Sequence, residues 1–179
     1  MAEKKKNPVA LSVIILAALV FAVIGLSSFY TDWLWYDQLG FASVFTTQVK
    51  GQVFAFVGGA LISGLFSWLA IWLATRSRPV YQQTTINSPA DAYRQLLEKT
   101  KNFWQFIVPA LAALIGGGYA SGKWQIAAAF INRTYTGETD SQFGLDIGFY
   151  LFDLPFYTAL TGFLTALSLV AVLAAAVIH

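Results

Sequence analysis

The amino-acid sequence predicts an all-α, polytopic membrane protein with four transmembrane helices and short helices that lie in the plane of the membrane interface. Three observations support this fold class: an apolar composition, four long apolar stretches, and an uneven distribution of cations along the chain. Of the 179 residues, 57% are hydrophobic and only 11% are charged, whereas soluble domains carry roughly a quarter charged residues. A mean hydropathy of +0.61 points in the same direction.

Four stretches are long and apolar enough to cross a bilayer, since about 20 apolar residues in a helix span a hydrocarbon core of about 30 Å. Asn7 as N-cap and Pro8 at the first helical position mark the start of the first stretch. We do not read this stretch as a cleaved signal peptide, because it exceeds the roughly 7–15 apolar residues of such peptides and no small-residue cleavage site follows. The expected spans are residues 8–29, 51–74, 103–121 and 154–178.

The cations predict the orientation of the chain, because short connections rich in Lys and Arg remain in the cytoplasm. Residues 1–7 and 75–102 hold eight of them: Lys4, Lys5, Lys6, Arg76, Arg78, Arg94, Lys99 and Lys101. Residues 30–50 and 122–153 hold three: Lys50, Lys123 and Arg133. We therefore predict a cytoplasmic N-terminus, with residues 30–50 and 122–153 outside. A re-entrant third span is the alternative, and it would invert everything after Trp104.

Aromatic side chains are concentrated next to the spans. Trp and Tyr favour the headgroup region, because each has an apolar ring and a polar group. We expect one or two short helices along the outer interface at about residues 32–47, with a surface for a partner or a lipid as the alternative reading. The predicted interfacial anchors are Trp33, Trp35, Tyr36, Trp104, Trp124 and Tyr150.

The other two connections also carry helical signals. Ser88 as N-cap, Pro89 at the first helical position and Asp91 in the first turn predict an amphipathic cytoplasmic helix that leads into the third span. On the outer side, we expect a helix near residues 124–135 followed by a turn through residues 136–140.

Small residues recur at every fourth position of the second span and in the third and fourth spans. Close approach of helices in lipid requires such residues, because backbone contact replaces the hydrophobic effect there. We expect these positions to pack against neighbouring helices, although the sequence does not identify the partner helix. They are Gly51, Ala55, Gly59, Ser63, Ser67, Gly117 and Gly162.

The sequence offers no constellation of residues for catalysis, metal binding or cofactor binding. It contains no Cys, and the sole His is His179. Asp146 and Asp153, if helical, would lie about 10.5 Å apart along one face, too far to share an ion or to act as a carboxylate pair. We expect these two acids to act at helix ends or at the interface. We predict no cofactor, no enzymatic activity in this chain, and no nucleic-acid partner.

Two segments resemble the N-terminal part of uncharacterised protein family 0182, which comprises bacterial multi-pass membrane proteins. The first is Tyr30–Tyr36 with Leu39–Phe41 and Val44–Phe45; the second is Gln142–Tyr150 with Phe152–Pro155. The resemblance covers roughly residues 9–165 and implies a bacterial inner-membrane location. Members of that family are far longer and carry a large extracytoplasmic region, so we expect this chain to be a fragment. The family has no assigned activity, so no functional residue is transferred.

Three functions are weighed from the sequence, of which a membrane enzyme would need its chemistry outside this chain, because Cys is absent, the only His is His179 and the acids are scattered. The first is a membrane anchor or assembly part of a larger cell-envelope protein, with the lipid bilayer and other envelope membrane proteins as partners. The second is a transporter or lipid-handling protein, suggested by Pro109 and the glycines Gly116–Gly118 in the third span. The absence of Asp, Glu, Lys, Arg and His from the four apolar cores argues against a proton-coupled carrier.

Overall fold

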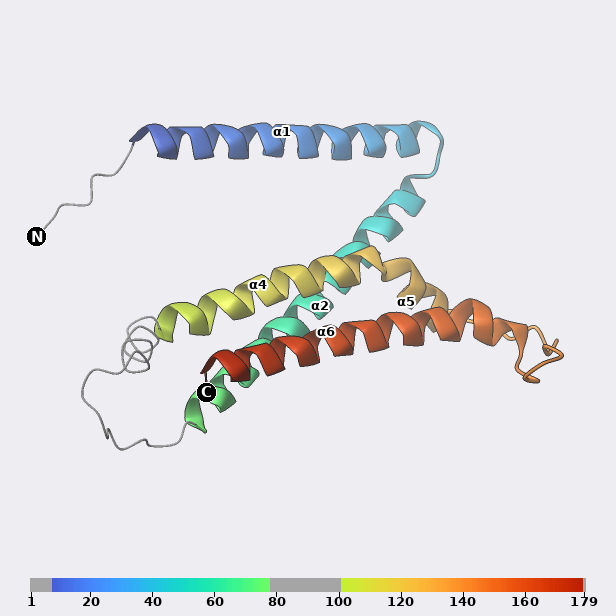
Figure 1. The fold of residues 1–179 in the computed structure, drawn as a ribbon. Coiled ribbons are helices and arrows are strands. Elements are labelled where there is room, and N and C mark those ends of the chain that lie inside the picture. The colour runs from blue at the N-terminus through green and yellow to red at the C-terminus, as the bar shows by residue number, and fades with distance from the viewer. Residues whose placement is uncertain (1–7, 78–100, 179) are drawn as a thin grey trace, which may run out of the picture. The chain divides into compact units, whose positions relative to one another are not determined.

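The computed structural model describes residues 8–77 and 101–178, and the regular elements within these ranges are helices (Figure 1). They are α1 (Pro8–Gln38), α2 (Ala42–Arg76), α4 (Lys101–Gly122), α5 (Trp124–Ile131), the π-helical turn η1 (Phe149–Asp153) and α6 (Leu154–Ile178). Four of these helices are long and apolar enough to cross a membrane, so the predicted all-α class is confirmed. The cytoplasmic helix start predicted at residues 87–91 lies outside the described residues.

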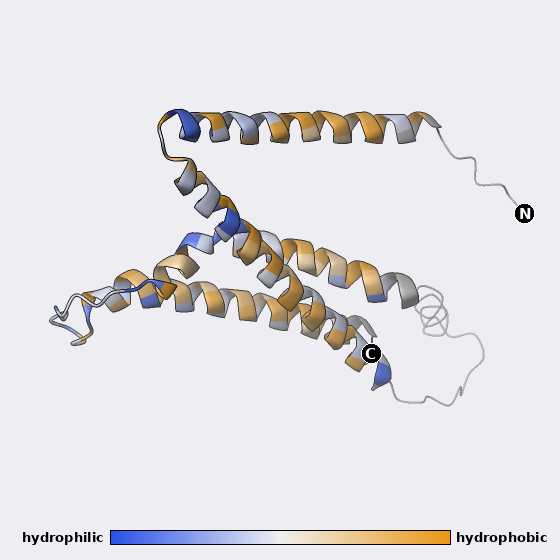
Figure 2. Ribbon diagram, turned by 180° about the vertical axis from the view of Figure 1, so that it is seen from behind, coloured by the Kyte–Doolittle hydropathy of each residue, from blue (hydrophilic) through white to orange (hydrophobic). Residues whose placement is uncertain are grey.

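The helices present apolar side chains over most of their length, and polar residues collect at their ends and in the loop between α5 and α6 (Figure 2). Hydrocarbon can solvate such surfaces, whereas water cannot do so without a large free-energy cost. The chain divides into two compact units, Met1–Val49 and Lys50–His179, which are considered separately below.

In the first unit, α1 continues without a break to Gln38, so the prediction of separate short helices at residues 32–47 is wrong. That segment consists instead of the last turns of α1, a tight turn, and the first turns of α2. The helix continues past the apolar stretch because residues 30–39 contain no Gly or Pro. Gly40 then turns the chain with a φ of +76°. The ring of Phe45 packs against Phe29 and Tyr36 across this turn, with centroid distances of 5.2 and 5.6 Å.

In the second unit, α2 and α4 run antiparallel and in direct contact. The buried positions of α2 follow one another at intervals of three or four residues, which places them on one face of the helix. They are Gly59, Ser63, Ser67, Ile71 and Ala74. Figure 1 shows α4 and α6 running in opposite directions, connected by α5 and its loop.

The helix predicted near residues 124–135 is present as α5, but it ends at Ile131. The chain then forms a folded loop and enters α6 through η1, where the Leu154 N–H donates to the Phe149 carbonyl. Pro155 follows directly and has no N–H, so it cannot supply the next hydrogen bond of a regular α-helix. The π-type turn precedes this proline, and π-helical backbone occurs mostly as such single turns next to α-helix. Helix α6 then covers Leu154–Ile178, the range predicted for the fourth span.

Candidate functional site

The closest approach in the second unit lies between α2 and α4, where glycines of both helices meet. A Cβ built on Gly59 would lie 2.5 Å from the Ala120 Cβ and 2.6 Å from the Gly116 carbonyl oxygen. A Cβ on Gly116 would overlap the Ser63 hydroxyl. Since non-bonded carbon atoms rest at about 3.5–4.0 Å, only glycine fits at these two positions with the helices at this separation.

The contact continues toward the N-terminal end of α2. A Cβ on Gly117 would lie 2.9 Å from the Phe56 ring, and a Cβ on Gly51 would clash with the Trp124 indole. Ala55, which lies between Gly51 and Phe56 in α2, is half-buried. Of the predicted packing positions, Gly51, Gly59, Ser63 and Gly117 therefore lie at the contact of α2 with α4 and the start of α5, and Ala55 and Ser67 follow at the same four-residue interval of α2.

The two buried serines of this face differ in their hydrogen bonding. The Ser63 hydroxyl donates to the Gly59 carbonyl at 2.7 Å within its own helix. Ser67 is fully buried, and its Oγ has no hydrogen-bond partner among the described residues. In the antiparallel register set by Gly59 with Gly116 and by Gly64 with Ala113, Ser67 falls near the level of Pro109.

Helix α4 is also joined to α6, through Tyr119. Its hydroxyl donates to the Ala159 carbonyl at 3.1 Å, and its ring stacks on Phe163 with a centroid distance of 5.9 Å. A Cβ on Gly162 would lie 3.5 Å from the Tyr119 hydroxyl, which is an ordinary contact. Gly162 is therefore less constrained than Gly59, although it lies at a helix contact as well.

Asp146 organises the loop between α5 and α6. Its carboxylate accepts hydrogen bonds from the N–H groups of Gly148 (2.6 Å) and Gly137 (2.7 Å), and from both the N–H and the hydroxyl of Thr136 (3.2 Å each). Desolvation acts to raise the pKa of Asp146, but these hydrogen bonds outweigh it and hold the pKa below the ordinary value. Asp146 is thus an ionised acceptor that closes the loop onto the start of the following helix.

Asp140 also accepts hydrogen bonds that hold the loop between α5 and α6 in place. It accepts from the Phe143 N–H at 2.8 Å and from the Tyr150 hydroxyl at 2.9 Å. Desolvation again opposes ionisation, and the hydrogen bonds again lower the pKa of Asp140. Sequence reasoning did not select Asp140, although its place before a turn is typical of an Asp that bonds nearby backbone N–H groups.

Asp153 is the buried acid of this region, with a side chain that is 7% exposed. Its Oδ1 lies 3.5 Å from Arg133 Nε, and its Oδ2 has no partner in the part of the chain that the structure describes. The same Nε donates to the Tyr135 hydroxyl at 3.3 Å, and this hydrogen bond raises the pKa of Arg133. The guanidinium also lies 4.4 Å from the Phe130 ring centroid, so Arg133 ties the end of α5 to the start of α6.

The predicted interfacial anchors are found at helix ends in both units. Trp33, Trp35 and Tyr36 lie in the last turns of α1, where Trp35 and Tyr36 make an edge-on ring contact at 5.2 Å. Trp104 lies in the first turns of α4, Trp124 begins α5, and Tyr150 lies in η1. Their role as membrane anchors stays a prediction.

The packing contacts and hydrogen bonds described above hold helices and a loop in place. Asp146 and Asp153 bind different partners, and their carboxylates are not brought together at one site. Within residues 8–77 and 101–178, no group of three His, Cys, Asp or Glu side chains is arranged to hold a metal ion. The candidate functional features are therefore the α2–α4 contact face and the hydrogen-bonded loop at the start of α6.

Comparison with known proteins gives a consistent family assignment. The family model described as "Uncharacterised protein family (UPF0182)" matches residues 9–179. A UPF0182 protein of Clavibacter sepedonicus is 42% identical over 172 residues, which make up 96% of this chain and 18% of that protein. A UPF0182 protein of Rhodococcus opacus is 35% identical over 178 residues, covering 99% of this chain and 18% of that protein.

The same proportions hold for a UPF0182 protein of Streptomyces coelicolor, which is 36% identical over 178 residues. The chain thus spans about 18% of the length of these relatives and corresponds to their N-terminal part. No solved structure matches the chain. Of the two sequence segments that suggested the family, the first covers the last turns of α1, the following turn and the start of α2, and the second runs from the loop before η1 into the start of α6. This chain belongs to UPF0182, a family of uncharacterised proteins whose members include these bacterial relatives.

Proposed function

We propose that this chain is a membrane anchor and assembly module of a larger cell-envelope protein, inserted in the bacterial inner membrane with its N-terminus in the cytoplasm. The observation that carries the proposal is the α2–α4 face, where Gly59 and Gly116 bring two apolar helices into backbone contact. Such a contact stabilises a helix pair in lipid, where burial of apolar surface gives little driving force.

The loop at the start of α6 supports the same proposal. Asp140 and Asp146 use their carboxylates as acceptors for neighbouring N–H and hydroxyl groups, which fixes the loop rather than leaving reactive groups exposed. A loop held in this way is a firm base for an extracytoplasmic region. The relatives are about five times as long as this chain, since it covers 18% of their length, so a large additional region is available for such a base to carry.

The transporter reading receives less support. It relied on Pro109 and on the glycines Gly116–Gly118 as a deformable point, yet α4 is helical through both positions. Gly116 and Gly117 are also occupied in contacts with α2. These glycines are explained by packing, so we retain the anchor as the proposed function.

Purification of an intact family member in mild detergent tests the proposal. If the chain is an assembly module, a defined envelope protein will copurify in stoichiometric amount, and substitution of Gly59 by Leu will reduce its recovery. The matched control is Gly58→Leu, because a Cβ at Gly58 meets no atom within 4 Å. An intact protein that purifies alone and carries solute or lipid flux above that of empty liposomes would contradict the proposal.

A further inference from the structure

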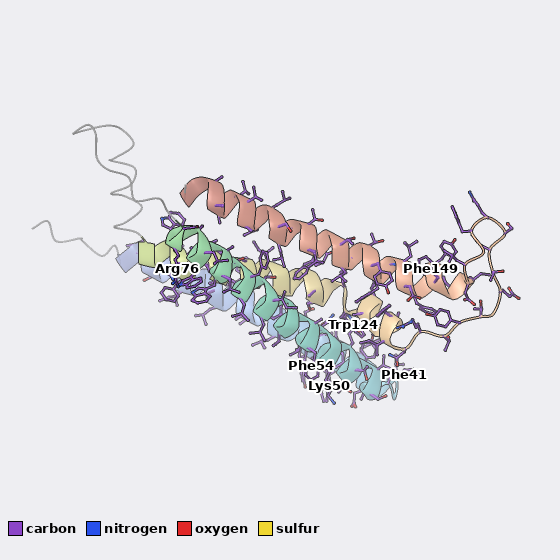
Figure 3. All side chains as sticks on the ribbon, turned by 90° about the horizontal axis from the view of Figure 1, so that it is seen from below. Phe41, Lys50, Phe54, Arg76, Trp124 and Phe149 are labelled. Atoms are coloured by element: carbon purple, nitrogen blue, oxygen red, sulfur yellow. The ribbon has the colours of Figure 1, made fainter. Side chains whose placement is uncertain are left out.

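Two lysines from distant parts of the sequence lie close together at one end of the second unit. Lys50 precedes Gly51, and Lys123 precedes Trp124, and Gly51 is in contact with the Trp124 indole. Figure 3 shows Lys50 and Trp124 near each other at the same end of α2. The contact between Gly51 and Trp124 therefore brings the backbone positions of Lys50 and Lys123 to the same end of the second unit.

Neither lysine forms an ion pair with an acid in residues 8–77 or 101–178. Both lysine side chains are exposed, and the one ion pair within the described residues joins Arg133 to Asp153. The acids of the nearby loop, Asp140 and Asp146, accept hydrogen bonds from their own loop. Lys50 and Lys123 thus form a local concentration of positive charge without an acidic partner among the described residues.

The position of the two lysines along the helices matches the level of lipid headgroups. Lys50 directly precedes the apolar stretch 51–74 of α2, and Lys123 follows the end of α4 at Gly122. Long lysine side chains at such positions extend their ammonium groups to the headgroup layer. Trp124, which follows Lys123, supplies an amphipathic ring that favours the same layer.

From this geometry we propose that Lys50 and Lys123 together bind the phosphate of one anionic phospholipid, with its acyl chains against the apolar surface beside Trp124. The net charge of the site selects the lipid. Two uncompensated cations attract a headgroup that carries net negative charge, such as phosphatidylglycerol, more than a zwitterionic one such as phosphatidylcholine. The inference rests on the proposed insertion of these helices in a bilayer.

Native mass spectrometry of the chain in detergent, with either phosphatidylglycerol or phosphatidylcholine added, tests this site. We expect one tightly held phosphatidylglycerol per chain and weaker retention of phosphatidylcholine. Lys50→Gln and Lys123→Gln should each weaken that single lipid about fivefold, the effect of one cation near a charged headgroup. Arg76→Gln, at the opposite end of α2, is the matched control and should leave this retention unchanged.

Three results would overturn the site: equal retention of the two lipids, two lipids each removed by one substitution, or an effect of Arg76→Gln as large as that of Lys50→Gln. Free inorganic phosphate at millimolar concentration should not displace the lipid if the acyl chains contribute, and displacement would assign the site to the phosphate group alone, against a lipid site. Circular dichroism and gel filtration of each variant report whether it folds.

Extraction of membranes with alkaline carbonate tests the proposed membrane insertion separately from the lysine site. A chain that leaves the membrane in carbonate contradicts the proposed insertion itself. A chain that stays in the membrane but binds the two lipids equally contradicts the lysine site alone.

Discussion

Substitution of Gly59 by alanine is the most direct perturbation of the α2–α4 contact. The added Cβ would lie 2.5 Å from the Ala120 Cβ and 2.6 Å from the Gly116 carbonyl oxygen. These neighbours are a methyl group and a backbone atom, so neither can rotate away as a long side chain would. Restoring a carbon–carbon separation of about 3.5–4.0 Å requires α4 to move by about 1 Å.

The expected free-energy change follows from two opposing terms. Insertion of a methylene-sized group into a well-packed contact costs about 1–3 kcal/mol. Replacement of Gly by Ala inside a helix contributes about 0.5–1 kcal/mol in the stabilising direction. Gly58→Ala isolates the second term, because a Cβ there meets nothing within 4 Å. We therefore expect Gly59→Ala to be about 2 kcal/mol less stable than Gly58→Ala.

Equilibrium unfolding of the two variants in mixed micelles, by titration with sodium dodecyl sulfate and circular dichroism, measures this difference. Both variants have the same composition, so their insertion and their interaction with detergent are matched. The reasoning is refuted if Gly59→Ala is as stable as Gly58→Ala, since α2 and α4 would then not approach each other at Gly59. Gly116→Ala should also be less stable than Gly58→Ala, because its Cβ would overlap the Ser63 hydroxyl.

Four further substitutions probe the other contacts. Tyr119→Phe keeps the ring but removes the hydrogen bond to the Ala159 carbonyl, and should cost about 0.6 kcal/mol in the same titration; no loss would mean that α4 and α6 are not joined there. Asp146→Asn should speed amide hydrogen exchange in the loop at neutral pH. Because folding lowers the pKa of Asp146, the wild-type loop should be protected above the ordinary value of 3.8 and lose protection as the pH falls through the lower folded value; a loop equally protected in the variant would contradict this role. Arg133→Gln should destabilise the chain in the same titration because it leaves the buried Asp153 carboxylate without its cation, and Asp153→Asn in the same chain should recover part of the loss; additive losses would argue against the ion pair.

The sequence predicted the helical class and the face of α2 that makes contact, because both follow from local composition and from a four-residue period. It did not predict which helix meets that face. Small residues recur in α4 and α6 alike, and the choice of α4 depends on the approach of Gly59 to Gly116, which are 57 positions apart in the sequence. Periodicity within one helix carries no information about such a pairing.

In the loop before α6 as well, the sequence did not predict which groups come into contact. Asp146 was expected at a helix end, and the structure places it there, but its donors Thr136 and Gly137 come from the preceding arm of the loop. The chain returns to Asp146 through Gly137 and Gly144, which adopt positive φ values. Gly137 lies in the turn that the sequence predicts at residues 136–140, whereas Gly144 and the atoms that the loop brings together were not predicted.

The end of α1 was misjudged for a physical reason. The apolar stretch stops near residue 29, and hydropathy predicts that the helix ends at the same point. Hydropathy reports the solvent of a helix, whereas the end of a helix is set by backbone breakers and caps. Gly25 lies inside α1 and does not end it; the first Gly or Pro after the apolar stretch is Gly40, and α1 ends two residues before it.

The central claim is that four helices cross a bilayer, with residues 30–50 and 122–153 outside and the N-terminus inside. The chain contains no cysteine, so single cysteines at Gln38 and at Glu138 can be labelled with a membrane-impermeant maleimide without background. The account predicts that both react in intact spheroplasts, and that a cysteine at Lys5 reacts only after the membrane is opened. Labelling of Lys5→Cys in intact spheroplasts, with Gln38→Cys and Glu138→Cys protected, would contradict it.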